Sequence, residues 1–446
     1  MKRSAIIVTI IFLLGICLSS QAFAQDGYTN YAGDLWSRST LTGDWGGFRN
    51  DLSKKGVTVD FNVTQVLQGV VGGGKETGWE YGGRGDLTIN ADTQKLGLWP
   101  GGFITVEVEG NWDKSVNGET GALMPVNTNQ LFPMAGSDQL NIPAVTLTQF
   151  LSHYFGVFVG KLDTMSGDMN EFAHGKGDTQ FFNTAFSINP VALLTIPYST
   201  LGAGVIILPT KDPNEAIINF MAVDANGAAE SSGFDTVAKG NTSYAGSARV
   251  RTDFFGLTGH QLVGGTYSTR NFTSIDQDLR IILENRTIQQ KDNSWCVFYN
   301  FDQYLYEVKK GSGQGIGVFG RFGASDGNPN PVHYFYSLGI GGKVLRTPRS
   351  LDNFGIGYYY INVSNPTFTG SLGNTRSFLG NEWGLEAYYN FAITPWMHLT
   401  PDIQYIRPGQ RNTVSIVGRD EAGLPIVNRS SLSSATVLGL RLQMIF

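Results

Sequence analysis

Cysteine is scarce in this sequence, with only Cys17 and Cys296 among 446 residues. Cys17 lies in an amino-terminal leader, so the remainder of the chain can form no internal disulfide. Lipidation of Cys17 is disfavoured, because Ile16 stands where a small residue would precede a lipidated cysteine. The fold must therefore be stabilised by packing and hydrogen bonding.

Long hydrophobic runs are missing after Leu18. A membrane-spanning helix needs about 20 apolar residues, and no later stretch approaches that length. This excludes a helical inner-membrane transporter. A β-barrel is not excluded, because each of its strands needs only about ten residues and half of them face water. The mean hydropathy of −0.09 fits such a chain.

Residues for metal binding and catalysis are few and scattered. No histidine lies close in sequence to another histidine or to a cysteine, which disfavours a metal site. There is no Gly-x-Ser-x-Gly elbow for acyl hydrolysis. The pair Glu107 and Glu109 fits a glycoside hydrolase, but carboxylates on one face of a water-filled channel explain it more simply. We therefore expect that the protein is not an enzyme and that it binds neither a cofactor nor a metal. The five histidines are His153, His174, His260, His333 and His398.

Basic residues are outnumbered, with 32 Lys and Arg against 37 Asp and Glu. This acidic balance disfavours a nucleic-acid partner. The amino terminus carries an export signal. Lys2 and Arg3 precede an uncharged run over 5–18, and the small residues Ala22 and Ala24 suit a signal peptidase. We predict a signal peptide over residues 1–24.

Alternation of apolar and polar residues runs through the rest of the chain. In the segment 57–68, valines and Phe61 alternate with Thr, Asp and Asn; the segments around 104–109, 382–391 and 397–405 behave similarly. A soluble sandwich would show the same alternation. Aromatic residues near strand ends favour membrane girdles instead. About sixteen strands are predicted, beginning near residues 57, 84, 103, 144, 154, 201, 217, 244, 260, 294, 314, 333, 353, 381, 397 and 434.

The segment from Thr436 to Phe446 reads as a wall strand of a barrel. Its even-numbered residues are apolar from Leu438 to Phe446, whereas Arg441 and Gln443 fall on the other face. Such a strand suits a bacterial outer-membrane barrel, in which an apolar row faces lipid. We expect it to engage the outer-membrane assembly machinery.

Three further segments interrupt the strand pattern. The range 42–56 predicts a short amphipathic helix, capped by Thr42 or Asp44, within a pre-barrel segment over 25–56. Its apolar residues Trp45, Phe48 and Leu52 are expected to pack against the periplasmic mouth of the barrel. The ranges 111–143 and 164–199 are too long and irregular for turns. Because the second is rich in phenylalanine, we predict that at least one of them folds into the lumen.

Several elements, in order, resemble the carbohydrate-selective porins of the OprB family. The first is Leu41–Arg49, with the sequence LTGDWGGFR. The others are GKLD at 160–163, NEFA at 170–173, QFFN at 180–183, PYSTLG at 197–202, GVFGRFGASDG at 317–327, PDIQYIRPG at 401–409 and VLGLR at 437–441. A small departure follows the last Pro-Gly pair, where Gln410 replaces the usual second glycine. The resemblance implies a single-domain, sixteen-stranded outer-membrane porin that passes sugars by diffusion, with the barrel over 57–446.

The chemistry of sugar passage suggests which residues line the pore. A neutral sugar needs hydrogen-bonding groups of both signs and an aromatic surface, held weakly enough to allow flux. Residues expected on lumen faces or near the early loops are Arg49, Arg84, Glu107, Glu109, Trp112, Asp163, Glu382 and Glu386. For each of them, pairing to a neighbouring side chain in the wall is the competing interpretation.

Other functions stay open at this point. One is a general or anion-preferring diffusion porin, and another is an exported soluble β-rich carbohydrate-binding protein. For the sugar porin we expect small sugars such as monosaccharides and outer-membrane lipid as partners, in a monomer or a homotrimer. The location is the outer membrane of a Gram-negative bacterium.

Overall fold

A computed structural model describes most of the chain. The described residues are 29–131, 139–165, 169–237, 239–278, 287–345, 349–366, 368–369, 379–419 and 425–446. The expected signal peptide over 1–24 lies outside them. No helix in this described part is long and apolar enough to cross a membrane.

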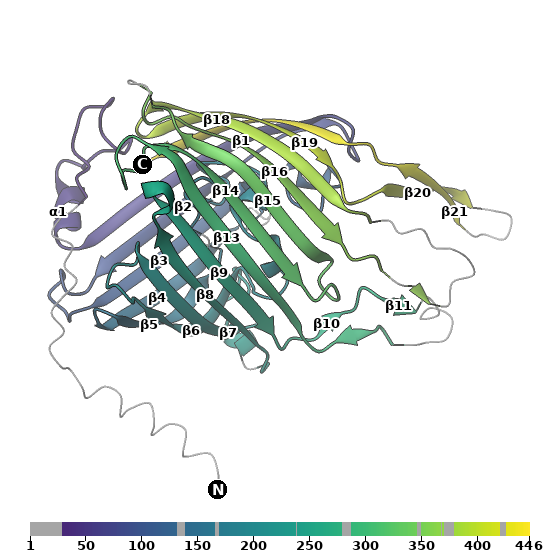
Figure 1. Ribbon diagram of the computed structural model, residues 1–446, viewed down its shortest axis with the longest axis horizontal. Helices are drawn as coiled ribbons and strands as arrows, with labels where there is room; N and C mark the ends of the chain where they lie inside the picture. Colours follow the sequence, from purple (N-terminus) through teal and green to yellow (C-terminus); the bar gives the residue numbers. More distant parts are fainter. Residues whose placement is uncertain are drawn as a thin grey trace, which may run out of the picture.

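Sixteen antiparallel strands close into one barrel (Figure 1). They are β1 (Val57–Gly72), β2 (Gly78–Asp92), β3 (Gly102–Asp113), β4 (Leu140–Ser152), β5 (Phe155–Asp163), β6 (Ser199–Ile207), β7 (Ala216–Asp224), β8 (Thr242–Thr252), β9 (Gly259–Ser268), β13 (Ser294–Glu307), β14 (Gly315–Ser325), β15 (Val332–Lys343), β16 (Asn353–Val363), β18 (Glu382–Thr394), β19 (Met397–Arg407) and β22 (Ala435–Ile445). Every predicted wall strand is confirmed. The largest differences in start are at β2 and β4, which begin before residues 84 and 144.

The barrel closes where β22 pairs with β1, with Ile445 opposite Asn62. Along β22 the burial alternates: Leu440 is exposed on the outer face, while Arg441 is fully buried on the inner one. Phe446 continues the outer row, because its ring lies 5.4 Å from that of Phe61. The predicted division of this strand into an outward apolar face and an inward polar face is confirmed, but the inward Arg441 and Gln443 are buried rather than facing water.

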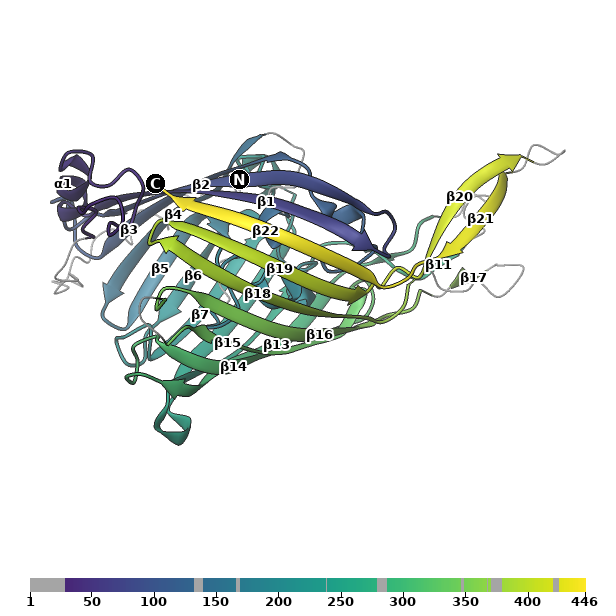
Figure 2. The same ribbon diagram turned by 90° about the horizontal axis from the view of Figure 1, so that it is seen from above.

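The two ends of the barrel differ. One end carries short turns and the carboxyl terminus, and the other carries longer connections (Figures 1 and 2). In outer-membrane barrels the short turns face the periplasm, so we call these the periplasmic and outer ends. Short strands decorate the outer end: β10 (Phe272–Thr273), β11 (Gln277–Asp278), β12 (Gln290–Lys291), β17 (Phe368–Thr369), β20 (Asn412–Arg419) and β21 (Pro425–Ser431). The β20–β21 hairpin projects beyond the barrel in Figure 2.

Aromatic rings gather on the outer face of the wall. Toward the outer end, the rings of Tyr336 and Tyr360 stack with their centroids 5.3 Å apart, and Trp383 lies 5.8 Å from Tyr405. Toward the periplasmic end, Tyr389 and Phe391 form a similar pair. Two separated aromatic zones are what the two interfaces of a bilayer require. A large outward apolar surface of this kind disfavours the soluble alternative.

The amino-terminal helix is shorter than predicted. Helix α1 spans Phe48–Lys54, and its N-cap is Gly47, without a side-chain cap. Neither Thr42 nor Asp44 is the cap, because Gly46 and Gly47 adopt left-handed conformations with φ of 69° and 95° and delay the helix. The predicted range 42–56 therefore began too early.

The face that α1 turns toward the barrel was also predicted wrongly. Trp45 and Phe48, expected to pack, are exposed, whereas Arg49 and Ser53 are buried. Arg49 is held by polar and aromatic partners of the segment, which the apolar spacing of a helix does not reveal.

Two connections fold into the lumen, as the phenylalanine content of the second predicts. We call the described residues 114–131 the first inward loop and the described residues 164–165 and 169–198 the second inward loop. They contain the 3-10 turns η2 (Val116–Gly118), η3 (Thr128–Gln130) and η4 (Pro190–Ala192) and the helix α2 (Thr184–Ser187); α3 (Phe234–Val237) and η5 (Phe254–Gly256) lie elsewhere. The loops are hydrogen-bonded to each other, from the Thr128 N–H to the Phe182 carbonyl at 2.8 Å.

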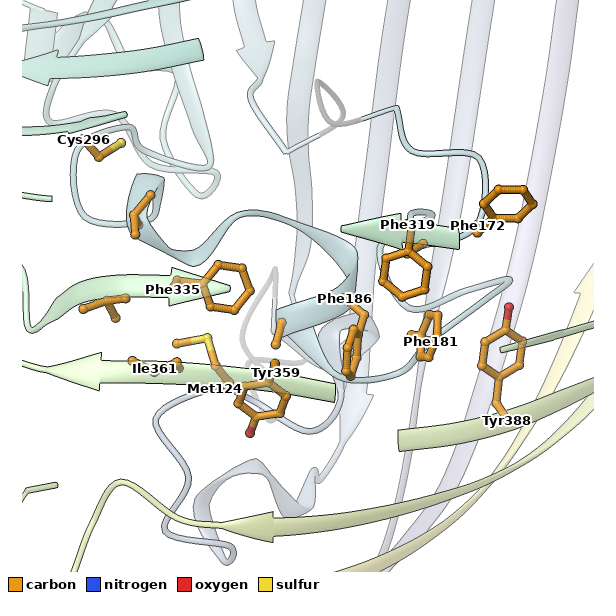
Figure 3. Packing of buried hydrophobic residues seen from close by; sticks show 14 of the residues in the cluster. Met124, Phe172, Phe181, Phe186, Cys296, Phe319, Phe335, Tyr359, Ile361 and Tyr388 are labelled. Atoms are coloured by element: carbon orange, nitrogen blue, oxygen red, sulfur yellow. The ribbon is translucent and has the colours of Figure 1, made fainter. Parts of the chain in front are cut away.

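An aromatic core joins the second inward loop to the wall (Figure 3). The ring of Phe181 lies 4.6 Å from Phe186 of the same loop and 4.8 Å from Tyr388 of β18. Phe186 also meets Phe319 of β14 and Tyr359 of β16 edge to face. This side of the lumen is therefore packed largely with apolar side chains.

Candidate functional site

A polar cavity of about 210 Å³ lies between strands β1 to β3 and the tip of the second inward loop. Side chains of both charges line it. The polar lining residues are Asn62, Arg84, Asp86, Thr88, Glu107, Glu109, Lys176 and Asp178. We call this set, together with the neighbouring Asp163, the polar passage.

Arg84 links the wall to the second inward loop. Its guanidinium lies 2.8 Å from the carboxylates of both Asp86, on the same strand, and Asp178, on the loop. It also donates to the carbonyl of Asn129 in the first inward loop at 3.2 Å. One buried cation thus connects three parts of the molecule at the edge of the passage.

Lys176 occupies the centre of an acidic group. Its ammonium forms ion pairs with Asp163 and, at 3.5 Å, with Glu109. The Tyr198 hydroxyl donates to the other oxygen of Glu109. Glu107 joins the group, since carboxylate oxygens of Glu107, Glu109 and Asp163 lie within 4.8 Å of one another. Three predicted site residues are thereby brought together with a cation that was not predicted.

Glu382 holds the first inward loop. Its carboxylate accepts hydrogen bonds from the backbone N–H groups of Leu123 at 2.6 Å and Met124 at 3.0 Å. It also accepts from the Gly409 N–H at 2.7 Å and the Tyr359 hydroxyl at 3.0 Å. Glu382 faces the lumen, as expected, but is completely buried beneath the loop. The structure therefore shows an anchor at this position, away from the polar passage.

Glu386 holds the second inward loop in the same way. It accepts from the N–H groups of Phe182 at 2.5 Å and Asn183 at 3.0 Å. Arg441 of β22 binds backbone carbonyls of the same loop, donating to that of Gly177 at 2.5 Å and that of Gln180 at 3.0 Å. Wall carboxylates thus bind loop N–H groups while a wall guanidinium binds loop carbonyls.

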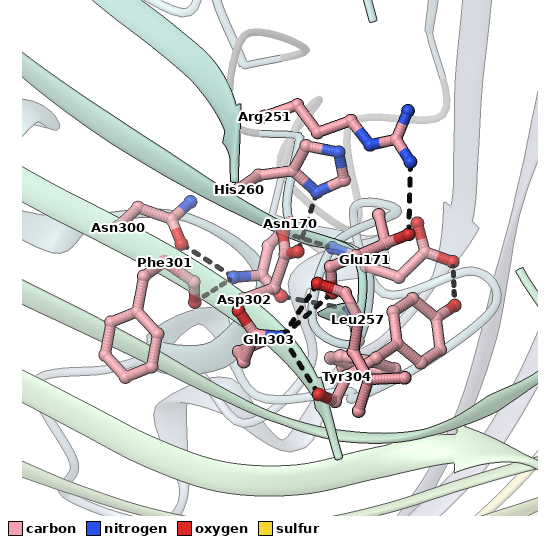
Figure 4. Close-up of polar contacts among 12 residues, drawn as sticks. Asn170, Glu171, Arg251, Leu257, His260, Asn300, Phe301, Asp302, Gln303 and Tyr304 are labelled. Atoms are coloured by element: carbon pink, nitrogen blue, oxygen red, sulfur yellow. Dashed lines mark hydrogen bonds and ion pairs between the residues drawn. The ribbon is translucent and has the colours of Figure 1, made fainter. Parts of the chain in front are cut away.

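The start of the second inward loop is fastened to β13 (Figure 4). The Asn170 side chain donates to Asn300 at 2.6 Å. The Glu171 N–H donates to the Asp302 carboxylate at 3.2 Å, and the Tyr304 hydroxyl donates to the Glu171 carboxylate at 2.7 Å. The loop is consequently fixed at both its beginning and its tip.

Two further predicted site residues, besides Glu382 and Glu386, lie away from the passage. Arg49 donates to Thr40 at 3.1 Å and its guanidinium lies over the Tyr31 ring at 3.8 Å, so it fastens the amino-terminal segment. Trp112 of β3 pairs with Gly83 of β2. Its side chain lies on the opposite face of β3 from those of Glu107 and Glu109. The expectation that Trp112 lines the pore is corrected, because this ring covers Gly83 on the outside of the wall.

Comparison with known proteins supplies the family. The family model described as carbohydrate-selective porin, OprB family, matches residues 76–446 of this chain. The chain belongs to the OprB family of carbohydrate-selective porins. It is accordingly an outer-membrane sugar porin, which places it in a Gram-negative outer membrane, and its family and fold are those of a channel.

Solved structures agree with this porin in fold. The high-pH structure of Pseudomonas putida OprB matches with a TM-score of 0.75 at 20% identity, covering 93% of this chain and 100% of that one. The low-pH structure of the same protein gives 0.53 at 17% identity, covering 92% and 99%. A comparison with curated protein sequences finds no match.

Sequence reasoning missed the loop side of the porin's polar passage. Lys176 and Asp178 come from a segment without periodicity, and neither was predicted. The available signal is local: Gly175 and Gly177 flank the lysine, and two glycines around one charged residue indicate a tight turn that presents it.

Proposed function

We propose that small neutral sugars cross this porin through the polar passage. The observation that carries the proposal is the shape of the lumen. The two inward loops and the aromatic core fill one side, and a cavity lined by charged and amide groups remains beside β1 to β3. Monosaccharides are the sugars that a passage of this scale suits best.

The lining offers the chemistry that a sugar needs. Carboxylates of Glu107, Glu109 and Asp163 accept hydrogen bonds from hydroxyl groups, and Arg84 and Lys176 donate to hydroxyl oxygens. Each of these groups already has a neighbour in the protein. Arg84, Lys176, Glu109 and Asp163 form ion pairs, and Glu107 lies beside Glu109 and Asp163. A sugar must therefore exchange hydrogen bonds rather than gain new ones, which keeps its binding weak and permits flux.

A preference for anions receives no support from the passage. Five carboxylates surround two cations there: Asp86, Glu107, Glu109, Asp163 and Asp178 against Arg84 and Lys176. An acidic lining repels anions. Between the two kinds of diffusion channel, the sugar porin is thus the better supported.

Swelling of liposomes that contain the purified porin tests the proposal. Sugars of monosaccharide size should enter faster than their size alone predicts, relative to non-sugar solutes of equal size. Entry at the rate expected for size alone would contradict selectivity. The double variant Arg84→Ala with Glu107→Ala should change sugar entry while the barrel stays folded; unchanged entry would contradict the assignment of the passage.

We also propose that residues 1–24 are removed during export. The charged start, the apolar run and the small residues before Gln25 support this processing. Mass spectrometry of the porin isolated from outer membranes tests it, and a mature chain that retained Lys2 would contradict it.

A further inference from the structure

We propose that Lys176 is a built-in counter-ion that occupies the acidic group of the passage and keeps mobile cations out of it. The inference rests on the proposed path for sugars and adds a residue that sets selectivity between neutral solutes and ions. It follows from the contacts of the lysine, from the backbone that presents it and from the charges around it.

The contacts place the lysine ammonium among clustered carboxylates. Oxygens of Glu107, Glu109 and Asp163 lie within 4.8 Å of one another, and such a cluster of carboxylates attracts cations such as Ca²⁺. The Lys176 ammonium pairs with two of the three. Although burial disfavours the charged ammonium, Asp163 and Glu109 hold the pKa of Lys176 above its ordinary value, so it is charged at neutral pH.

The backbone presents the lysine in a defined way. Gly175, Lys176 and Gly177 all have positive φ, of 88°, 48° and 82°. A lysine with positive φ is uncommon, since this region favours glycine. The tip is also confined: a Cβ on Gly177 would lie 2.7 Å from the backbone nitrogen of Asn129, and Arg441 binds the Gly177 carbonyl. Lys176 is therefore a fixed part of the passage, unlike a lysine on a solvated loop.

The other cation of the passage cannot replace it. Arg84 is engaged by Asp86 and Asp178, each at 2.8 Å. Loss of the lysine would leave Glu109 and Asp163 without this ion-pair partner, with Glu107 beside them. Small cations from solution would then enter the group, and a bound cation would compete with sugar hydroxyls for the same oxygens.

Ion selectivity in planar bilayers tests the inference. The variant Lys176→Gln should raise the permeability of K⁺ relative to Cl⁻ several-fold, measured from the reversal potential in a KCl gradient. Lys176→Arg keeps the charge and should retain the wild-type ratio. Lys239→Gln is the matched control, because it removes the same charge from an exposed position on an outer loop. Millimolar CaCl₂ should reduce the conductance of Lys176→Gln more than that of the wild type.

A compensating variant guards against a folding defect. Lys176→Gln combined with Glu107→Gln removes one charge of each sign and should return the permeability ratio toward the wild-type value. The inference is overturned if Lys176→Gln leaves both the reversal potential and the Ca²⁺ response unchanged. It is also overturned if Lys239→Gln shifts the ratio equally. Sugar entry into wild-type liposomes separates the two proposals, since slow entry there would contradict the sugar path whatever the variants do.

Discussion

Arg84 and Asp178 form a partly buried ion pair, 2.8 Å long, between the second wall strand and the tip of the second inward loop. The aspartate belongs to the loop and the arginine to the wall, so this contact joins the loop to the wall beside the polar passage. Its removal takes away one of the two carboxylates that neutralise Arg84 and leaves only Asp86 as its ion-pair partner.

Replacing Asp178 with Asn should loosen this attachment. We expect the loop tip to move away from β2 and the single-channel conductance to rise, at a cost of roughly 1.5–3 kcal/mol to the attachment of the loop, the range for a hydrogen bond to a charged group. Conductance in planar bilayers measures the effect. Asp235→Asn, on an exposed outer loop, is the control. A conductance equal to that of the wild type would show that the ion pair does not position the tip.

Replacement of Glu382 tests how the first inward loop is attached to the wall. Its replacement by Ala leaves the Leu123 and Met124 N–H groups without their acceptor, and each unsatisfied buried donor costs about 1–3 kcal/mol. We expect the first inward loop to become accessible to a protease added from the outer side. The control is Glu76→Ala, at an exposed turn. Full protection of the loop in the Glu382 variant would count against the anchoring role.

Trp112 should be dispensable for sugar passage. Its ring lies outside the wall over Gly83, so Trp112→Phe should leave sugar entry into liposomes unchanged while Arg84→Ala in the same strand pair alters it. A loss of sugar entry in the Trp112 variant would return this residue to the passage and contradict the register of β2 and β3.

Phe446 should matter for assembly before it matters for permeation. The Phe446 N–H donates to the Phe61 carbonyl at 2.8 Å, and the two rings pack on the outer face of the closing strands. A charged residue in an outward position costs free energy in lipid. Phe446→Asp should therefore lower the folded fraction in outer-membrane vesicles, measured by heat-modifiable gel mobility, whereas Phe446→Tyr should not. Normal insertion of the Asp variant would argue against a lipid-facing Phe446.

The wall of the barrel could be predicted from sequence because each strand carries its own information. Alternation with period two is local, and it survives even where Pro209 and Pro213 crowd the connection between β6 and β7. Those prolines lie in a turn, outside the ladder, where no backbone donor is required. The local pattern was therefore sufficient.

The interior could not be predicted in the same way. Glu382 and Glu386 were placed correctly on the lumen face, but their partners Met124 and Asn183 lie 258 and 203 residues away in sequence. No local pattern distinguishes a carboxylate that anchors a loop from one that meets a solute. Lys176 escaped notice for the same reason, because its role depends on acids supplied by two different strands.

The aromatic core inside the barrel has a consequence for biogenesis. Phe181 and Phe186 are translated early, yet they pack against β14, β16 and β18, and the loop that carries them is also held by Arg441 on the final wall strand. Until those strands arrive, the phenylalanine rings have no apolar surroundings. A nascent chain arrested before β18 would expose them to water and require a chaperone in the periplasm. Completion of the wall and concealment of the loop are thus a single late event.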